Sequence, residues 1–182
     1  MTVIYGYLND TDTYVLRNIW DGFKNVKVVN AFNKNRDTLT KAISNEKDIL
    51  IFCGHGSPDG LFGTEGYVLS SKNVEFVKAK YVIGVWCYAK DFAKKFPLRG
   101  FFTSMYISNI DEAFLVLPSI GSNRVPTSEE ITQSEIKFCK TLNSFIRTRL
   151  DEFENWPKLI LETIPSENVV EKYNHEALEY VS

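Results

Sequence analysis

Two short stretches of this chain each place a reactive side chain directly after an apolar run. In DILIFCGHGSPDG, the apolar run is followed by His55, which lies between two glycines. In YVIGVWCYA, a second apolar run ends at Cys87. A cysteine thiolate is a strong nucleophile, and a neighbouring imidazole is a common group that generates or stabilises it near neutral pH. The two stretches therefore predict a Cys/His pair that could carry out covalent catalysis.

The predicted strands would bring these two side chains together. His55 and Cys87 each follow the carboxyl end of a strand-like run, and sequential strands of an α/β sheet are usually neighbours. Ligands of such sheets bind outside the carboxyl ends of the strands. The backbone N–H groups of Gly56 and Cys87 are then candidates for an oxyanion hole. We expect His55 to act as the general base and Cys87 as the nucleophile.

The order of the expected elements predicts an α/β fold. Apolar, strand-like segments alternate with segments in which apolar residues recur at helical spacing. This alternation calls for a mostly parallel sheet with helices on both faces, a three-layer αβα sandwich. The expected strands span 2–7, 25–32, 48–53, 81–87 and 99–108, and the expected helices span 13–23, 36–45, 72–80, 89–96 and 108–117. Ser108 and Asp111 have the spacing of a helix cap.

The pattern around His55 and Cys87 resembles the caspase-like clan of cysteine peptidases. In that clan, which includes caspases, gingipains, legumains, separases and CHAT domains, one apolar strand ends in His-Gly and a later one ends in Cys. The resemblance implies a caspase-like sheet and hydrolysis of peptide bonds by a His/Cys dyad. Residue by residue, His55 matches the catalytic His, Gly56 the oxyanion-hole glycine and Cys87 the nucleophile. A peptide or protein would be the substrate.

The last third of the sequence predicts helices only. Thr127 and Glu130 form a capping box at the start of a long amphipathic helix. Two more helices are expected around 155–164 and 166–180. We therefore divide the chain into a caspase-like α/β domain, 1–125, and a C-terminal helical extension, 126–182. The extension could pack on the sheet, form a subdomain or present a face to a protein partner.

Composition excludes several classes of protein. The net charge of −2 argues against a general nucleic-acid binder. No apolar run is long enough to span a bilayer, so no membrane partner is expected. The amino-terminal residues do not resemble a signal peptide, and three isolated cysteines favour a reducing compartment. The sequence thus predicts a cytoplasmic protein of 182 residues that requires no cofactor.

The sequence is also compatible with a metal site and with other functions. Zinc could be bound by Cys53, His55 and Cys87 with a distant fourth ligand such as Cys139 or His175, since zinc accepts both residue types. We favour a buried Cys53 and Cys139, a surface His175 and no metal site. The main alternative function is a non-catalytic binding or scaffold protein on the same fold. A flavodoxin-like domain of unrelated function is a third possibility.

Overall fold

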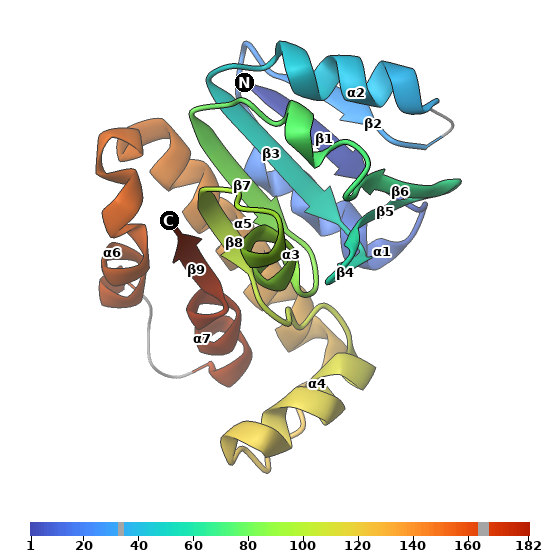
Figure 1. Ribbon diagram of the computed structural model, residues 1–182. Coiled ribbons are helices and arrows are strands. Elements are labelled where there is room, and N and C mark those ends of the chain that lie inside the picture. Colours follow the sequence, from blue (N-terminus) through green and yellow to red (C-terminus); the bar gives the residue numbers. More distant parts are fainter. Residues whose placement is uncertain (33–34, 164–167) are drawn as a thin grey trace.

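A six-stranded sheet forms the centre of the computed structural model, which describes residues 1–32, 35–163 and 168–182 (Figure 1). The strands that lead to the site, β3 and β7, are its two middle strands. All neighbouring pairs are parallel except the last, β8 with β9. The expected α/β sandwich with a mostly parallel sheet is confirmed. In spatial order the strands are β2 (Lys27–Asn30), β1 (Thr2–Gly6), β3 (Ile49–Gly54), β7 (Tyr81–Val85), β8 (Gly100–Thr103) and β9 (Leu178–Val181).

Alternate residues of the central strands pack into two separate cores, because successive side chains of a strand point to opposite faces. Ile51 and Cys53 of β3 pack with the 3-10 helix η1 (Val15–Ile19) and the long helix α5 (Ser128–Thr148). Leu50 and Phe52 pack on the other face with α2 (Arg36–Asn45) and α3 (Ala89–Lys95). Burial on both faces explains why β3 is an uninterrupted apolar run.

Short elements surround the carboxyl edge of the sheet. Helix α1 (Thr11–Tyr14) follows β1, and α4 (Ile110–Val116) with the 3-10 turn η3 (Leu117–Ile120) follows β8. A small antiparallel sheet follows β3 and consists of β4 (Gly56–Ser57), β5 (Gly60–Gly63) and β6 (Gly66–Leu69). The expected helix over 72–80 is only a 3-10 turn, η2 (Val74–Phe76). Likewise, the helix expected over 13–23 is divided between α1 and η1.

The C-terminal region is not entirely helical. The capping box of Thr127 and Glu130 at the start of α5 is confirmed, and η4 (Leu150–Asn155), α6 (Trp156–Thr163) and α7 (Val169–Glu176) follow. The helix expected over 166–180 is wrong at its end, because β9 pairs with β8. Without β9, the backbone groups along one edge of β8 would have no strand to pair with, and β9 supplies those hydrogen-bond partners. Residues 164–167, on which parts of two expected helices fall, lie outside the described residues.

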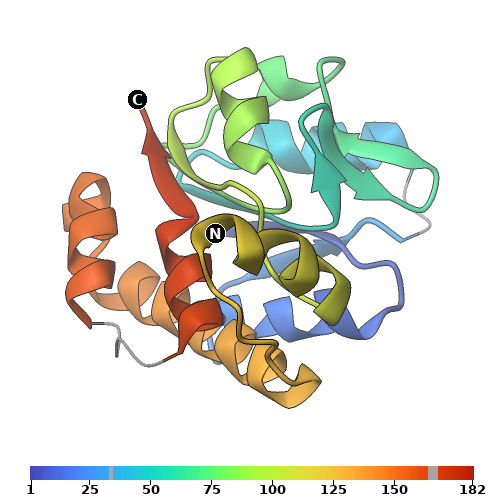
Figure 2. The same ribbon diagram turned by 90° about the horizontal axis from the view of Figure 1, so that it is seen from below.

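Two further expectations about single residues are wrong. His175 is buried, with 3% of its surface exposed, because α7 packs beside α5 (Figure 2) and the ring lies against Phe138. The cap of α4 is Asn109, whose side chain accepts a hydrogen bond from the Glu112 N–H at 3.0 Å. Asp111 therefore lies in the first turn instead of forming the cap. None of the helices in the described residues has the length and apolar character needed to cross a bilayer.

Candidate functional site

The register of β3 against β7 places His55 and Cys87 level with each other. Cys53 pairs with Val85 at the ends of the two parallel strands. His55 and Cys87 each come two residues after that pair. Both side chains line one cavity of about 20 Å³ at the carboxyl edge of the sheet. The structure therefore brings together the two residues that the sequence singles out.

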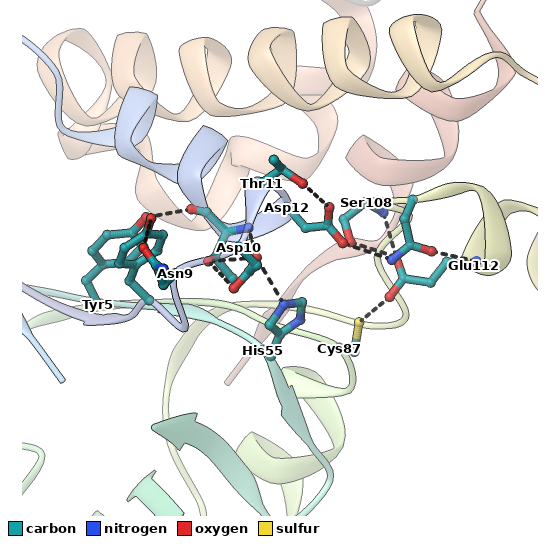
Figure 3. Close-up of polar contacts among 12 residues, drawn as sticks. Tyr5, Asn9, Asp10, Thr11, Asp12, His55, Cys87, Ser108 and Glu112 are labelled. Carbon is teal, nitrogen blue, oxygen red and sulfur yellow. Dashed lines mark hydrogen bonds and ion pairs between the residues drawn. The ribbon is translucent and has the colours of Figure 1, made fainter. Parts of the chain in front are cut away.

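A carboxylate that the sequence reasoning missed contacts the imidazole. The Oδ1 atom of Asp10 lies 3.4 Å from Nε2 of His55 (Figure 3). Asp10 also caps α1, accepting hydrogen bonds from the Thr13 N–H at 2.8 Å and from the Thr13 hydroxyl. Burial alone would raise the pKa of Asp10, but the Thr13 bonds and His55 outweigh it and the pKa is lowered. Asp10 can therefore orient the ring as an ionised carboxylate.

The Cys87 thiol faces a different carboxylate. Its Sγ lies 3.7 Å from the carbonyl oxygen of Tyr106. It also lies 3.8 Å from Oε1 of Glu112 (Figure 3). Within the described part of the chain, no hydrogen bond joins Cys87 to His55. Burial, together with the negative charge of Glu112, raises the pKa of the thiol to about 12. In this arrangement the thiol is protonated and donates to oxygen acceptors.

Glu112 is itself held in place by α4 and the loop before it. Its Oε2 accepts hydrogen bonds from the Ser108 N–H at 2.7 Å and from the Ser108 hydroxyl at 2.8 Å. The amide of Asn109 donates to Asp12 at 3.1 Å, which links the start of α4 to α1. The position of Glu112 beside the sulfur is thus fixed by contacts between segments far apart in the sequence.

Trp86 and Gly56 are packed together beneath the site. The indole N–H of Trp86 donates to the Ser57 carbonyl at 3.2 Å, and its backbone N–H donates to the Thr103 hydroxyl at 3.1 Å. A Cβ on Gly56 would lie 2.1 Å from Cδ1 of Trp86, so this contact requires a glycine. The cavity wall includes Gly54 rather than Gly56. The oxyanion role expected for the amides of Gly56 and Cys87 stays a prediction.

Glu135 and Tyr106 complete the cavity wall, and sequence reasoning missed both. Glu135 projects from α5 and is 1% exposed, and Tyr106 is 4% exposed. Burial, with the charges of Asp12, Glu112 and Asp10 as smaller causes, raises the pKa of Glu135 to about 9. A buried acid on an otherwise apolar helix face is the signal that could have identified Glu135.

The chain matches no protein-family model, no curated protein and no solved structure with which it was compared. The site must therefore be interpreted from its own geometry. Cys53 and Cys139 are fully buried in the core, as expected. Within residues 1–32, 35–163 and 168–182, no three His, Cys, Asp or Glu side chains are grouped so that they could hold a metal ion.

Proposed function

We propose that this chain is a cysteine peptidase of the caspase-like type. One observation carries the proposal. His55 and Cys87 follow the ends of the adjacent strands β3 and β7 at equivalent positions, and both line the same cavity. Asp10, in contact with the imidazole, adds an orienting carboxylate that is typical of nucleophile–base–acid arrangements.

The proposed reaction begins with transfer of the Sγ proton of Cys87 to His55. The thiolate then attacks the carbonyl carbon of a peptide bond, and backbone amides stabilise the resulting oxyanion. His55 returns the proton to the leaving amine as the C–N bond breaks and a thioester forms. Water, deprotonated by His55, hydrolyses the thioester and regenerates the thiol. Asp10 stabilises the imidazolium that forms at each transfer.

This reaction requires a change in the surroundings of the sulfur. The Cys87 thiol donates to the Tyr106 carbonyl or to Glu112 in the structure, and its pKa is raised to about 12. Rotation of the Cys87 side chain from Glu112 toward His55 would exchange a carboxylate neighbour for an imidazole. We therefore interpret the described arrangement as a resting state of the peptidase.

Turnover of a peptide library, analysed by mass spectrometry, tests the proposal. The wild type is expected to cleave a subset of peptides, and Cys87→Ala and His55→Ala are each expected to abolish those cleavages. Undiminished cleavage by Cys87→Ala, or no cleavage of any peptide by the wild type, would contradict the proposal. Glu129→Gln, an exposed substitution on α5, serves as the control that should retain full activity.

A second candidate function is a non-catalytic binding protein on the same fold. Four large apolar side chains are exposed on the segment that follows the site, namely Phe114, Leu115, Ile120 and Val125, and two of them, Phe114 and Val125, line one surface pocket. Grouped apolar residues on a surface are typical of protein-binding regions. Capture of a partner that survives Cys87→Ala and is lost in Leu115→Ser, with no peptide cleaved by the wild type, would favour this function.

A further inference from the structure

Two residues of the cavity wall beside Cys87 each have a buried polar atom without a partner among the described residues. Among the described residues, no group forms a hydrogen bond with Oε1 of Glu135 or with the Tyr106 hydroxyl. Both residues line the cavity together with His55 and Cys87. A buried polar group that lacks a partner costs free energy, so each such group in a native fold calls for an explanation. A polar ligand that enters the cavity would pair with both.

The charges around the cavity determine which ligand would be favoured. Burial raises the pKa of Glu135, and the nearby carboxyl groups of Asp12, Glu112 and Asp10 raise it further. Of these acids, only Asp12 and Glu135 line the cavity itself. The other polar or titratable side chains of the wall are Thr13, His55, Trp86, Cys87, Tyr106 and Ser108, and none of the wall residues in the described chain is Lys or Arg. The surroundings are acidic, so a cation is favoured over an anion or a neutral group.

The size of the cavity narrows the choice of cation. Its volume is about 20 Å³. A space of about 10–15 Å³ already holds one water molecule, so the cavity accommodates one group of that size. A primary ammonium group is comparable to water in size and has three N–H donors. A guanidinium group is larger, planar and a poorer fit.

We propose that this cavity receives a primary ammonium group, so that the substrate of Cys87 has a lysine side chain close to the bond that is cleaved. The part of this inference that concerns the substrate rests on the proposed peptidase function, whereas ammonium binding does not. The ammonium group donates one hydrogen bond to Oε1 of Glu135 and one to the Tyr106 oxygen. Glu135 releases its proton to the solvent as the cation binds.

Binding can be tested without any turnover. The Cys87→Ala protein is titrated with n-butylammonium chloride while the ¹³C-carboxyl NMR signals of its glutamates are followed, with tetramethylammonium chloride at equal ionic strength as the control salt. We expect n-butylammonium alone to deprotonate Glu135 at neutral pH. The Glu135→Gln variant should lose binding, and Tyr106→Phe should weaken it roughly tenfold. An equal response to both salts, or unchanged n-butylammonium binding in Glu135→Gln, would overturn the inference.

Peptides in which lysine is replaced by norleucine test the substrate class. Lysine peptides should be cleaved roughly ten- to hundredfold faster, since norleucine leaves a buried charge partner unpaired. Glu135→Gln should remove this preference, and Glu129→Gln should retain it. Cleavage without a preference for lysine overturns the inference and leaves the peptidase function intact. If the chain binds ammonium but cleaves no peptide, the cation site is supported and the proposed peptidase function is contradicted.

Discussion

At the scale of single residues, Glu112 is expected to control the reactivity of Cys87. Its Oε1 atom lies 3.8 Å from the sulfur, and burial and this carboxylate together raise the thiol pKa to about 12. Glu112→Gln removes the negative charge and keeps a similar shape. We therefore expect a lower thiol pKa and faster alkylation by iodoacetamide at neutral pH, measured as the rate across a range of pH.

Loss of charge must be distinguished from loosening of α4 in this experiment. Ser108→Ala removes one hydrogen bond to Glu112, the 2.8 Å bond from the Ser108 hydroxyl, but keeps the carboxylate. It should leave the thiol pKa close to that of the wild type. Equal acceleration in both variants would mean that access to the sulfur, rather than the charge of Glu112, limits alkylation.

Glu135 should make the stability of the fold depend on pH. Its pKa is raised to about 9 in the folded chain, whereas an unfolded glutamate titrates at about 4.3. Between these values the folded state holds a proton that the unfolded state has released, so the free energy of unfolding falls as pH rises. Urea unfolding between about pH 7 and 8.5, above the ordinary pKa of histidine, should show this decline.

The Glu135→Gln variant provides the comparison, because glutamine does not titrate. Its stability should change less with pH than that of the wild type over the same range. Glu129→Gln, on the exposed side of the same helix, should behave as the wild type does. Identical pH dependence of wild type and Glu135→Gln is the result that would contradict a protonated Glu135.

At the scale of elements, the turn between β3 and β4 depends on the absence of a side chain at residue 56. A Cβ there would lie 2.1 Å from Cδ1 of Trp86 and 2.7 Å from the Gly60 carbonyl oxygen. Gly56→Ala should therefore destabilise the fold by about 1–3 kcal/mol, as overpacking usually does. Urea unfolding measures this change. Ser57→Ala, the next residue of β4, should cost no more than about 0.5 kcal/mol, and equal effects would contradict the packing argument.

Asp10, at the start of α1, both caps the helix and contacts the imidazole of His55. Asparagine caps helices about as well as aspartate, so Asp10→Asn should preserve stability, whereas Asp10→Ala should cost about 1 kcal/mol. If Asp10 also orients His55, Asp10→Asn should reduce peptide cleavage although the protein stays folded. Unchanged cleavage in Asp10→Asn would restrict Asp10 to its capping role.

The elements that the sequence predicted well are those buried on both faces of the sheet. Strands β3 and β7 are continuous apolar runs, and their shared edge follows from the order of strands and helices. This was enough to predict that His55 and Cys87 lie at the same edge of the sheet, where they line one cavity. Glu112 and Asp10 could not be assigned in the same way, because α4 and α1 are short and their positions depend on contacts such as the bond between Asn109 and Asp12.

At the scale of the whole molecule, the expected boundary at residue 125 divides the packed core. Helix α5 and Trp156 cover one face of the sheet, and the Trp156 ring stacks on Phe101 of β8 at 5.2 Å between centroids. The last strand of the sheet, β9, also comes from this C-terminal part. The C-terminal third thus contributes to the same core and the same sheet as residues 1–125.

Truncation tests this packing. A fragment of residues 1–125 would expose Phe101 and the other side chains that α5 covers, and each large apolar residue contributes about 1.5–3 kcal/mol when buried. We expect the fragment not to unfold cooperatively in urea, whereas the full chain should show one transition. A cooperative transition in the fragment would mean that 1–125 is an independent domain.

The central claim is that Cys87 and His55 form one nucleophilic site, and covalent labelling by a peptide tests it most directly. A peptidyl acyloxymethyl ketone with lysine next to the reactive group alkylates a cysteine only when a catalytic site activates that thiol. Intact-mass and fragment analysis should find one adduct, on Cys87, and none in His55→Ala. Labelling of Cys87 at the same rate in His55→Ala, or no labelling of the wild type at any peptide sequence, would contradict the claim.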